Sequence, residues 1–458
     1  MAGFAKKVDI TGGPLMRSIL TYAVPIMLGS FVQVAFNAAD LAVVGNMADE
    51  NAVASVGATS VVTSLLVTSF IGLSAGASAI LARCIGQRND VRASRVVSTA
   101  MIFSAVLGLL VTLLTFFLAG PVLRMMDCPD ECFDGAALYL RIYSLGIPAL
   151  MIYNFGVGII RTTGDSQKPF FYIVFAGLLN VALNFVLCLI IEQKVAAVAI
   201  ATAASQYLGG TLTLIHLIRL KGGCALNLRK LSFNFRELWG ILKIGAPCAF
   251  NSALFSLSNL QMGAAINSYG AEAVAGNSAA TTTEGMVSSF CTGFTSAIVP
   301  FVGQNVGSGN KKRVRKSILY CGLISVTVAL TLSQGIFFFR HEILGMYLPN
   351  SEAAVEFGIK RMKYVLLMYP ISALFNTCTS SLQAFGYSLI PMINSVLTVF
   401  VFRIVWLEFI YPPLDAANRV ISNVYMCYSF SWLLTLLAHT TMFTVIYVRY
   451  LKGKVKEI

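Results

Sequence analysis

The stretch PLMRSILTYAVPIMLGSFVQVAFNAADLAVVGN, residues 14–46, decides the fold of this chain. It is long and apolar enough to cross the hydrocarbon core of a membrane, which takes about 20 mostly apolar residues. Arg17 stands near its start and Asp40 lies well inside it. Ionising a carboxylate in hydrocarbon costs several kcal/mol, so an acid there usually faces a partner or a water-filled cavity. The stretch therefore predicts a membrane helix that carries a functional acid.

The composition extends this prediction to the whole chain. Of 458 residues, 57% are hydrophobic and only 12% are charged, whereas soluble domains are about one quarter charged. The net charge of +13 is divided into short runs between apolar segments. Nucleic-acid binding would instead need a basic face or arm, so we expect no nucleic-acid partner. The composition indicates an all-α polytopic membrane protein.

Twelve segments are long enough to span the bilayer. Most of the 33 Lys and Arg residues fall between them on one side, which places both termini in the cytoplasm under the positive-inside rule. We therefore expect a multi-pass protein of the cytoplasmic (inner) membrane, with no secretory signal peptide. The expected helices are 15–45, 52–84, 94–120, 134–160, 169–191, 195–219, 238–268, 273–305, 314–338, 356–382, 389–411 and 420–448.

The two halves of the chain are versions of one six-helix unit. A shift of 221 residues places Asn89 on Asn310, and a shift of 222 places Pro148 on Pro370. Six helices per copy make the repeats parallel, and such halves typically enclose a substrate site about which they rock. We expect an N-terminal lobe at 1–219, a cytoplasmic basic linker at 220–237 and a C-terminal lobe at 238–458.

Four polar residues of the first half can share one depth in the membrane. They are Asp40 in the first helix, Asn180 and Asn184 one turn apart in the fifth, and Thr202 in the sixth. Their oxygens suit a coupling cation: Na+ held by the set, or a proton taken up by Asp40. The alternative is that the amides and the hydroxyl are hydrogen-bonded glue between helices.

The repeat places this ion chemistry in the first half only. Asp40 corresponds to Gln261 or Met262, depending on a one-residue gap, and the two asparagines correspond to Phe402 and Trp406. None of these four residues is acidic. We therefore expect a single coupling site.

Other charged residues also fall within apolar segments. Glu284 suits a second protonatable group or a counter-charge for a cationic substrate, or else a carboxyl hydrogen-bonded to Thr281–Thr283 or to another helix. We interpret Arg403 and Glu408 as a structural pair or as side chains that snorkel to the interface. His439 is interpreted as a packing residue.

Three residues bear on conformation and redox state. Pro25 removes a backbone hydrogen bond and bends the first helix; the bend is either coupled to protonation of Asp40 or a static kink. Cys128 and Cys132 in MMDCPDECFD could bridge or hold a metal, and the other cysteines are interpreted as buried thiols.

Several energy-converting and catalytic motifs are absent from the sequence. GQNVGSGNKK lacks the terminal Ser or Thr of a P-loop, so ATP is not the expected energy source. No nucleophile elbow or metal-binding His pair occurs. We expect a secondary transporter without cofactor rather than an enzyme, a multi-span sensor being the third hypothesis.

Several sequence motifs of this chain are typical of one transporter family. The chain resembles bacterial multidrug and toxic compound extrusion (MATE) transporters of the DinF-like branch, through FNAADLAVVGN, GIIRTTGDSQKP followed by NVALN, GAEAVAGNSAATTTEGM and FVGQNVGSGN. The resemblance implies two lobes around a cavity that opens alternately to each side. It also implies export of amphipathic organic cations or drugs by antiport, driven by inward H+ or Na+.

The resemblance also assigns site residues. Asp40 matches the family's acid in the first helix, Asn180 and Thr202 match polar members of the first-lobe site, and Asn154 matches a weaker one. Many DinF-like relatives carry an acid where this chain has Asn184, which favours a single-proton mechanism while leaving Na+ open.

Expected partners are a small-molecule substrate and the lipid bilayer, with the protein monomeric. The alternative function is a flippase for a lipid-linked precursor, which would need basic residues in its cavity; Arg403 is the one deeply placed candidate.

Overall fold

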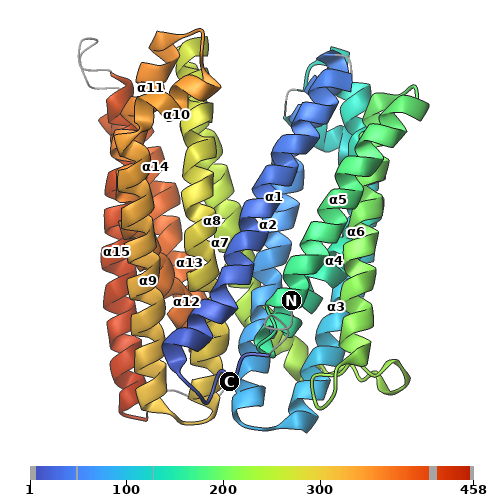
Figure 1. The fold of residues 1–458 in the computed structure, drawn as a ribbon, viewed down its shortest axis with the longest axis vertical. Coiled ribbons are helices and arrows are strands. Elements are labelled where there is room, and N and C mark those ends of the chain that lie inside the picture. The colour runs from blue at the N-terminus through green and yellow to red at the C-terminus, as the bar shows by residue number, and fades with distance from the viewer. Residues whose placement is uncertain (1–6, 48–49, 127, 412–419, 454–458) are drawn as a thin grey trace. The chain divides into compact units, whose positions relative to one another are not determined.

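The computed structural model describes residues 7–47, 50–126, 128–411 and 420–453, without the side chains of 37–47 and 50–53. All regular secondary structure in these residues is helical (Figure 1). The long helices of the first half are α1 (Leu15–Met47), α2 (Glu50–Gly86), α3 (Asp90–Met125), α4 (Asp130–Thr162), α5 (Gln167–Ile190) and α6 (Lys194–Arg219). The α-helices of the second half are α7 (Phe235–Asn267), α8 (Ala271–Gly307), α9 (Lys311–Phe338), α10 (Arg340–Tyr347), α11 (Glu352–Tyr364), α12 (Tyr369–Ala384), α13 (Leu389–Ser395), α14 (Phe402–Val405) and α15 (Ile421–Leu451).

Within the described residues, 12 helical segments are long and apolar enough to cross a membrane. They correspond one to one with the twelve segments expected from the sequence, which confirms the predicted fold class. Ten of them are single helices, and two are composite. The tenth, Glu352–Ala384, contains α11 and α12, and the eleventh, Leu389–Ile410, contains α13 and α14.

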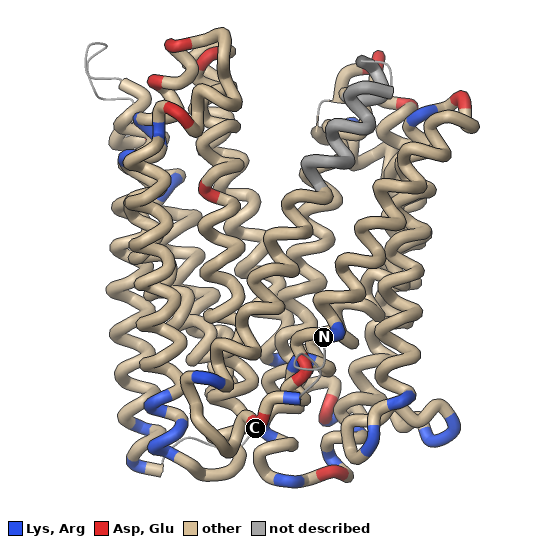
Figure 2. The backbone as a smooth tube through the Cα atoms, viewed as in Figure 1, with Lys and Arg blue, Asp and Glu red and all other residues tan. Residues whose placement is uncertain are grey.

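The chain forms two compact units. The first contains Met1–Asp9 and Phe31–Gly245, and the second contains Ile10–Ser30 and Ala246–Ile458. These limits fall inside α1 and α7, whereas the expected lobes meet at the linker, so each unit takes the first part of one long helix from the other half of the sequence. Lys and Arg gather at the lower end of the helices in Figure 2, and in the second unit several also lie towards the opposite end.

Packing explains why the first part of α1 joins the second unit. Tyr22 meets Phe301 of α8 edge to face at 5.4 Å. The Arg313 guanidinium at the start of α9 donates to the carbonyls of Ile10, Gly12 and Gly13. A side chain at Gly293 of α8 would collide with the α1 backbone. These contacts hold residues 10–30 against α8 and α9.

Local turn chemistry repeats at the spacings expected from the sequence. The Asn89 side chain caps α3 by accepting from the Arg92 amide at 2.9 Å, and Asn310 caps α9 through the Arg313 amide at 3.0 Å. Gly164 and Gly386 both end helices with positive φ, +91° and +76°, a backbone region that favours glycine. Equivalent residues therefore make equivalent turns in both halves.

The second half departs from the first in two helices. α4 continues through Pro148, but its counterpart is interrupted by the 3-10 turn η2 (Leu366–Met368), after which α12 begins with Tyr369 and Pro370. Proline cannot donate a backbone hydrogen bond and is favoured in a first helical turn. The counterpart of α5 contains two π-helical stretches, η3 (Val396–Val401) and η4 (Trp406–Ile410), a geometry that is frequent at functional sites.

The linker is anchored to the first unit rather than free. It contains the short helix η1 (Leu228–Lys230), and Leu226 is buried, with its amide donating to the Leu217 carbonyl. At the start of α7, Glu237 accepts two hydrogen bonds from Arg92 of α3, at 3.0 and 3.3 Å. The basic linker and the start of α7 thereby pack against the beginning of α3 and the end of α6.

The Cys128 and Cys132 thiols are free, with their Sγ atoms 3.6 Å apart beside the start of α4. Burial and the neighbouring Cys132 thiol raise the pKa of Cys128 above its ordinary value. Within the described residues no cluster of three metal-ligating side chains occurs here or elsewhere. Because both thiols are free in this structure, the disulfide between them remains a prediction.

Candidate functional site: a polar cavity in the first unit

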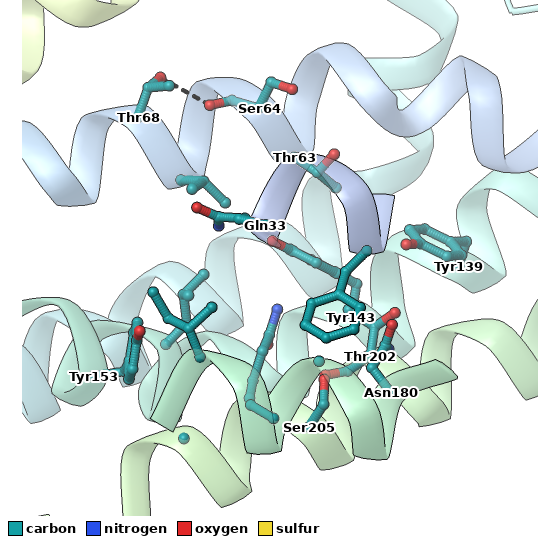
Figure 3. A pocket seen from close by; sticks show the side chains of 18 residues that line it. Gln33, Thr63, Ser64, Thr68, Tyr139, Tyr143, Tyr153, Asn180, Thr202 and Ser205 are labelled. Carbon is teal, nitrogen blue, oxygen red and sulfur yellow. Dashed lines mark hydrogen bonds between the residues drawn. The ribbon is translucent and has the colours of Figure 1, made fainter. Parts of the chain in front are cut away.

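A cavity of about 420 Å³ opens among the helices of the first unit (Figure 3). Its described lining comes from α1, α2, α4, α5 and α6 and contains no Lys, Arg, Asp or Glu. Amides, hydroxyls and phenols share the wall with apolar groups. The polar members of the lining are Gln33, Thr63, Ser64, Thr68, Tyr139, Tyr143, Tyr153, Asn180, Thr202, Ser205 and Gln206.

Two of the four residues predicted for the cation site meet in this cavity. Asn180 of α5 and Thr202 of α6 both line it, although they are 22 positions apart in the chain. Asn180 is buried at 7% exposure, and the Thr202 hydroxyl donates to the Val198 carbonyl of its own helix at 3.0 Å. The carbonyl and hydroxyl oxygens of these two side chains are the kind of ligand that an alkali cation accepts.

The other predicted residues lie elsewhere. Asn184 is fully buried at 0% exposure, one turn from Asn180, and does not line the cavity. Asn154, the weaker candidate, donates its amide to the Leu150 carbonyl within α4 at 2.9 Å and is likewise outside the lining. Asp40 lies in α1, but its side chain is outside the described part of the structure.

Sequence reasoning missed most of the aromatic and amide lining. Tyr139 and Tyr143 stack one turn apart on α4, with ring centroids 6.0 Å apart, and Gln33 lines the cavity from α1. The signal that could have found the tyrosines is their spacing of four residues, which places them on one helix face. A wall of phenols beside neutral oxygens suits an organic cation or a small inorganic cation.

Glu284, the weaker candidate in the second unit, is bound by an arginine that sequence reasoning did not single out. Arg361 of α11 donates to both carboxylate oxygens of Glu284 on α8, at 2.9 and 2.7 Å. It also donates to the Asn277 side chain at 2.9 Å. Of the alternatives for Glu284, the structure supports the bond to another helix.

Arg403 neither pairs with Glu408 nor snorkels outward, so both interpretations of it were wrong. It is buried at 1% exposure and donates to Asn259 at 2.9 Å, Ser258 at 3.2 Å and Ser431 at 3.4 Å. The ion pairs Arg92–Glu237, Lys168–Asp165 and Arg361–Glu284 do not include it. The π-helical turns on either side of α14 change which residues face inward, which a regular helical period cannot predict.

His439 and Pro25 are both buried. His439 lies 3.1 Å from the Thr379 hydroxyl and 3.3 Å from the Pro391 carbonyl, so it joins helices by hydrogen bonds in addition to packing. α1 continues as a helix through Pro25, where the ring leaves one backbone carbonyl without its helical donor.

The fold and this cavity define a polytopic membrane transporter. The MatE family model matches residues 25–186 and again 247–407, two segments offset by 222 residues at their starts (25 to 247) and 221 at their ends (186 to 407). The chain belongs to the MATE family, and the double match confirms the internal repeat.

Named relatives and solved structures agree with this assignment. The chain is 25% identical over 402 residues to the probable multidrug resistance protein YpnP of Bacillus subtilis, covering 87% of this chain and 89% of the relative. It is 24% identical over 396 residues to the probable multidrug resistance protein NorM of Thermotoga maritima, covering 85% and 84%. Its fold matches an outward-facing multidrug resistance MATE transporter of the MOP superfamily with a TM-score of 0.88 at 20% identity, covering 98% and 99% of the two chains.

Proposed function

We propose that this transporter is an antiporter that exports amphipathic organic cations or drugs, driven by the inward flow of H+ or Na+. The observation that carries the proposal is the first-unit cavity, where Asn180 and Thr202 face a common space beside three tyrosines. The relatives named as multidrug resistance proteins support the substrate class. We further propose a monomer in the inner membrane with both termini in the cytoplasm.

Asp40 supplies the charge that the described lining lacks. In α1, position 40 lies one turn beyond Phe36 and two turns beyond Gln33, and both of those residues line the cavity. Residues four and seven apart share one helix face. This register supports Asp40 as the coupling residue, with Asn180, Thr202 and the adjacent Asn184 completing the site.

The direction of coupling follows from electrostatics. A carboxylate among neutral groups binds a cation or a proton when the cavity is open to the side of high cation concentration. A cationic substrate from the other side competes for the same charge, so entry of the coupling ion releases the drug. Pro25, on the same helix, is the proposed point at which α1 changes its bend when Asp40 is neutralised.

The flippase alternative is less well supported. A carrier for a phosphorylated lipid needs basic groups in its cavity, and the described lining contains none. The buried arginines are engaged within the second unit: Arg403 donates to Ser431 and Asn259, and Arg361 donates to Glu284. An antiporter for cations fits these residues better.

The first test is Asp40→Asn, which keeps the size of the side chain and removes its charge. We expect efflux of a cationic dye from cells to be abolished while the purified variant remains folded and membrane-inserted. The matched control is Asp165→Asn in the turn between α4 and α5, which should transport normally. Efflux at the wild-type rate in Asp40→Asn would overturn the mechanism.

The coupling ion is identified in proteoliposomes with pH and Na+ gradients imposed separately. Dye uptake that follows one gradient alone names the ion. A lipid-linked sugar that moves when no dye does would favour the flippase.

A further inference from the structure

The second unit carries a buried ion pair at the positions where the first unit carries its cavity. The repeat shifts of 221 and 222 residues place Glu284 on Thr63 and Arg361 on Tyr139. Thr63 and Tyr139 both line the first-unit cavity. These shifts are the ones that the matching helix caps and glycine turns establish. The ion pair therefore stands at the second repeat's copy of the cavity.

The space at these equivalent positions differs strongly between the units. A pocket of about 30 Å³ remains in the second unit, lined in part by Ser288 and Ser372. The same shifts place these serines on Val67 and Leu150, which line the first-unit cavity of about 420 Å³. A volume near 30 Å³ holds about one water molecule. Beside Ser288 and Ser372 the second unit therefore leaves room for about one water molecule.

Arg361 brings a covalently attached cation to this part of the second unit. The Arg361 guanidinium meets both oxygens of Glu284 and lies 5.1 Å from the centre of the Tyr428 ring. Both members of the pair are buried, at 5% and 3% exposure. Arg403 stands over the same Tyr428 ring at 4.3 Å, so a second positive charge lies close by. An additional cation would be repelled by two guanidinium groups.

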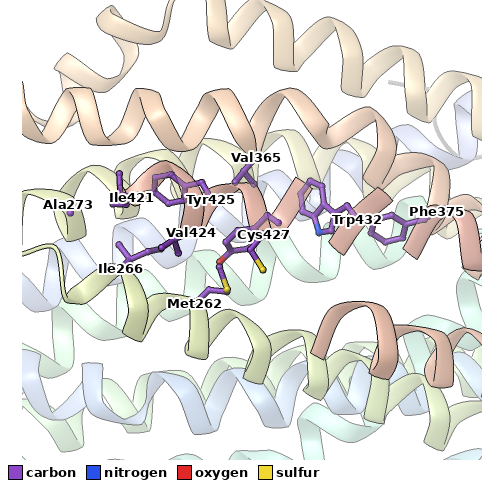
Figure 4. Close-up of a cluster of buried hydrophobic side chains, with 11 residues drawn as sticks. Met262, Ile266, Ala273, Val365, Phe375, Ile421, Val424, Tyr425, Cys427 and Trp432 are labelled. Atoms are coloured by element: carbon purple, nitrogen blue, oxygen red, sulfur yellow. The ribbon is translucent and has the colours of Figure 1, made fainter. Parts of the chain in front are cut away.

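A cluster of buried, mostly apolar side chains (Figure 4) includes Tyr425, whose ring centre lies 5.9 Å from the Arg361 guanidinium. Val365, Tyr425 and Trp432 belong to a cluster of buried side chains from α7, α8, α12 and α15 that surrounds this part of α11. Low polarity strengthens the attraction between the two charges and makes an uncompensated carboxylate costly. Glu284 therefore depends on a positive partner.

We propose that the Arg361 guanidinium is a tethered cation at the second repeat's copy of the cavity, where it keeps Glu284 compensated and excludes mobile ions from this position. The first unit leaves the equivalent position open, and the second fills it permanently. The comparison with a first-unit cation site rests on the proposed function. The occupation of Glu284 by Arg361 does not depend on that comparison, since it rests on the repeat and on the two hydrogen bonds between these side chains.

The test removes the tethered cation and asks whether a mobile one replaces it. Arg361→Gln is made in an Asp40→Asn background, so that Asp40 cannot contribute to ion binding. The thermal unfolding midpoint Tm of the purified protein is measured with NaCl against choline chloride at fixed pH, and between pH 5 and 8 without Na+. The ionisable groups near Glu284 are Tyr369, Tyr425, Tyr428 and Cys291, none of which supplies a positive charge. Arg403, over the Tyr428 ring, is the remaining cation nearby and is left unchanged in every variant.

We expect Arg361→Gln to lower Tm and to acquire a rise of about 3 °C with about 150 mM NaCl or on acidification, because a ligand bound only by the folded state raises Tm. The Glu284→Gln/Arg361→Gln double variant should lose this rise. Arg361→Lys keeps a tethered cation and should show no such ion dependence. A rise with Na+ assigns an alkali cation to the opened site, and a rise with acid assigns a proton.

Two results would overturn the proposal. One is a Tm of Arg361→Gln that responds to neither ion, or that responds equally when Glu284 is Gln. The other is an Arg361→Gln protein that cannot be purified under any of these conditions while the double variant can, because no mobile cation would then replace the guanidinium. Failure of the mechanism proposed for the first unit would appear separately, as efflux at the wild-type rate in Asp40→Asn.

Discussion

At the scale of single residues, a side chain's partner decides its role more than its type does. Asn180 and Asn154 are both asparagines inside membrane helices, yet Asn180 lines the cavity while Asn154 returns its amide to the Leu150 carbonyl. Asn180 is therefore placed to act on a ligand. Asn154 is placed to satisfy its own helix.

This difference predicts unequal effects of the same substitution. Asn180→Ala should lower the initial rate of dye transport about tenfold, since losing one polar contact to a bound cation costs about 1 to 2 kcal/mol. Asn154→Ala should change the rate less than about twofold. Transport assays in proteoliposomes with equal amounts of each protein measure both. Equal losses in the two variants would remove Asn180 from the site.

At the scale of helices, close backbone contact fixes how α8 meets α11. A side chain added at Gly276 of α8 would lie 2.8 Å from the Gly358 amide nitrogen of α11, and one at Gly358 would lie 3.1 Å from the Gly276 carbonyl. Small residues let membrane helices approach in this way. The contact is one residue from Asn277 and three from Arg361, so it sets the distance across which the ion pair forms.

Gly276→Ala should therefore destabilise the protein by about 1 to 3 kcal/mol through overpacking. Gly285→Ala is the matched control, because it lies on the same helix and an added methyl group there meets nothing within 4 Å. The control should be neutral or stabilising by up to about 1 kcal/mol, as alanine favours helix over glycine. Thermal unfolding in detergent compares them, and a Gly276→Ala protein as stable as its control would contradict this packing.

At the scale of the whole molecule, the two sequence repeats are not the two compact units. Residues 10–30 of the first half belong to the second unit, and residues up to Gly245, including the start of α7, belong to the first. Neither half of the sequence contains all of either unit. Each half therefore lacks part of its own packing partners.

A chain divided between Gly222 and Gly223 tests this arrangement. Gly222 lies in an exposed turn with φ of +83°, so the cut itself should be tolerated. We expect each fragment expressed alone to be degraded or aggregated, and the two expressed together to assemble into transporting protein. Size-exclusion chromatography and dye efflux report assembly. A stable, monodisperse fragment on its own would show that the exchanged segments are dispensable.

Much of the fold could be predicted because its causes are local. Apolar length gave the twelve spans, and Asn89, Asn310, Gly164 and Gly386 make turns that depend on neighbouring residues alone. Asn180 and Thr202 could be predicted to meet because both lie at one depth in adjacent helices. For the tyrosines of the lining the only signal is the four-residue spacing of Tyr139 and Tyr143, which is weak because aromatic residues are common throughout apolar helices.

By itself, the sequence determined the membrane class, the parallel repeat and the family motifs, since these depend on hydrophobic length and on short-range backbone preferences. Only the tertiary structure decided that Arg361 binds Glu284 across 77 residues of chain, that Arg403 turns inward between π-helical stretches, and that α1 and α7 are divided between the two units. Each of these depends on which helix faces pack together. Helix packing is set by side-chain shape over the whole molecule, and no local pattern encodes it.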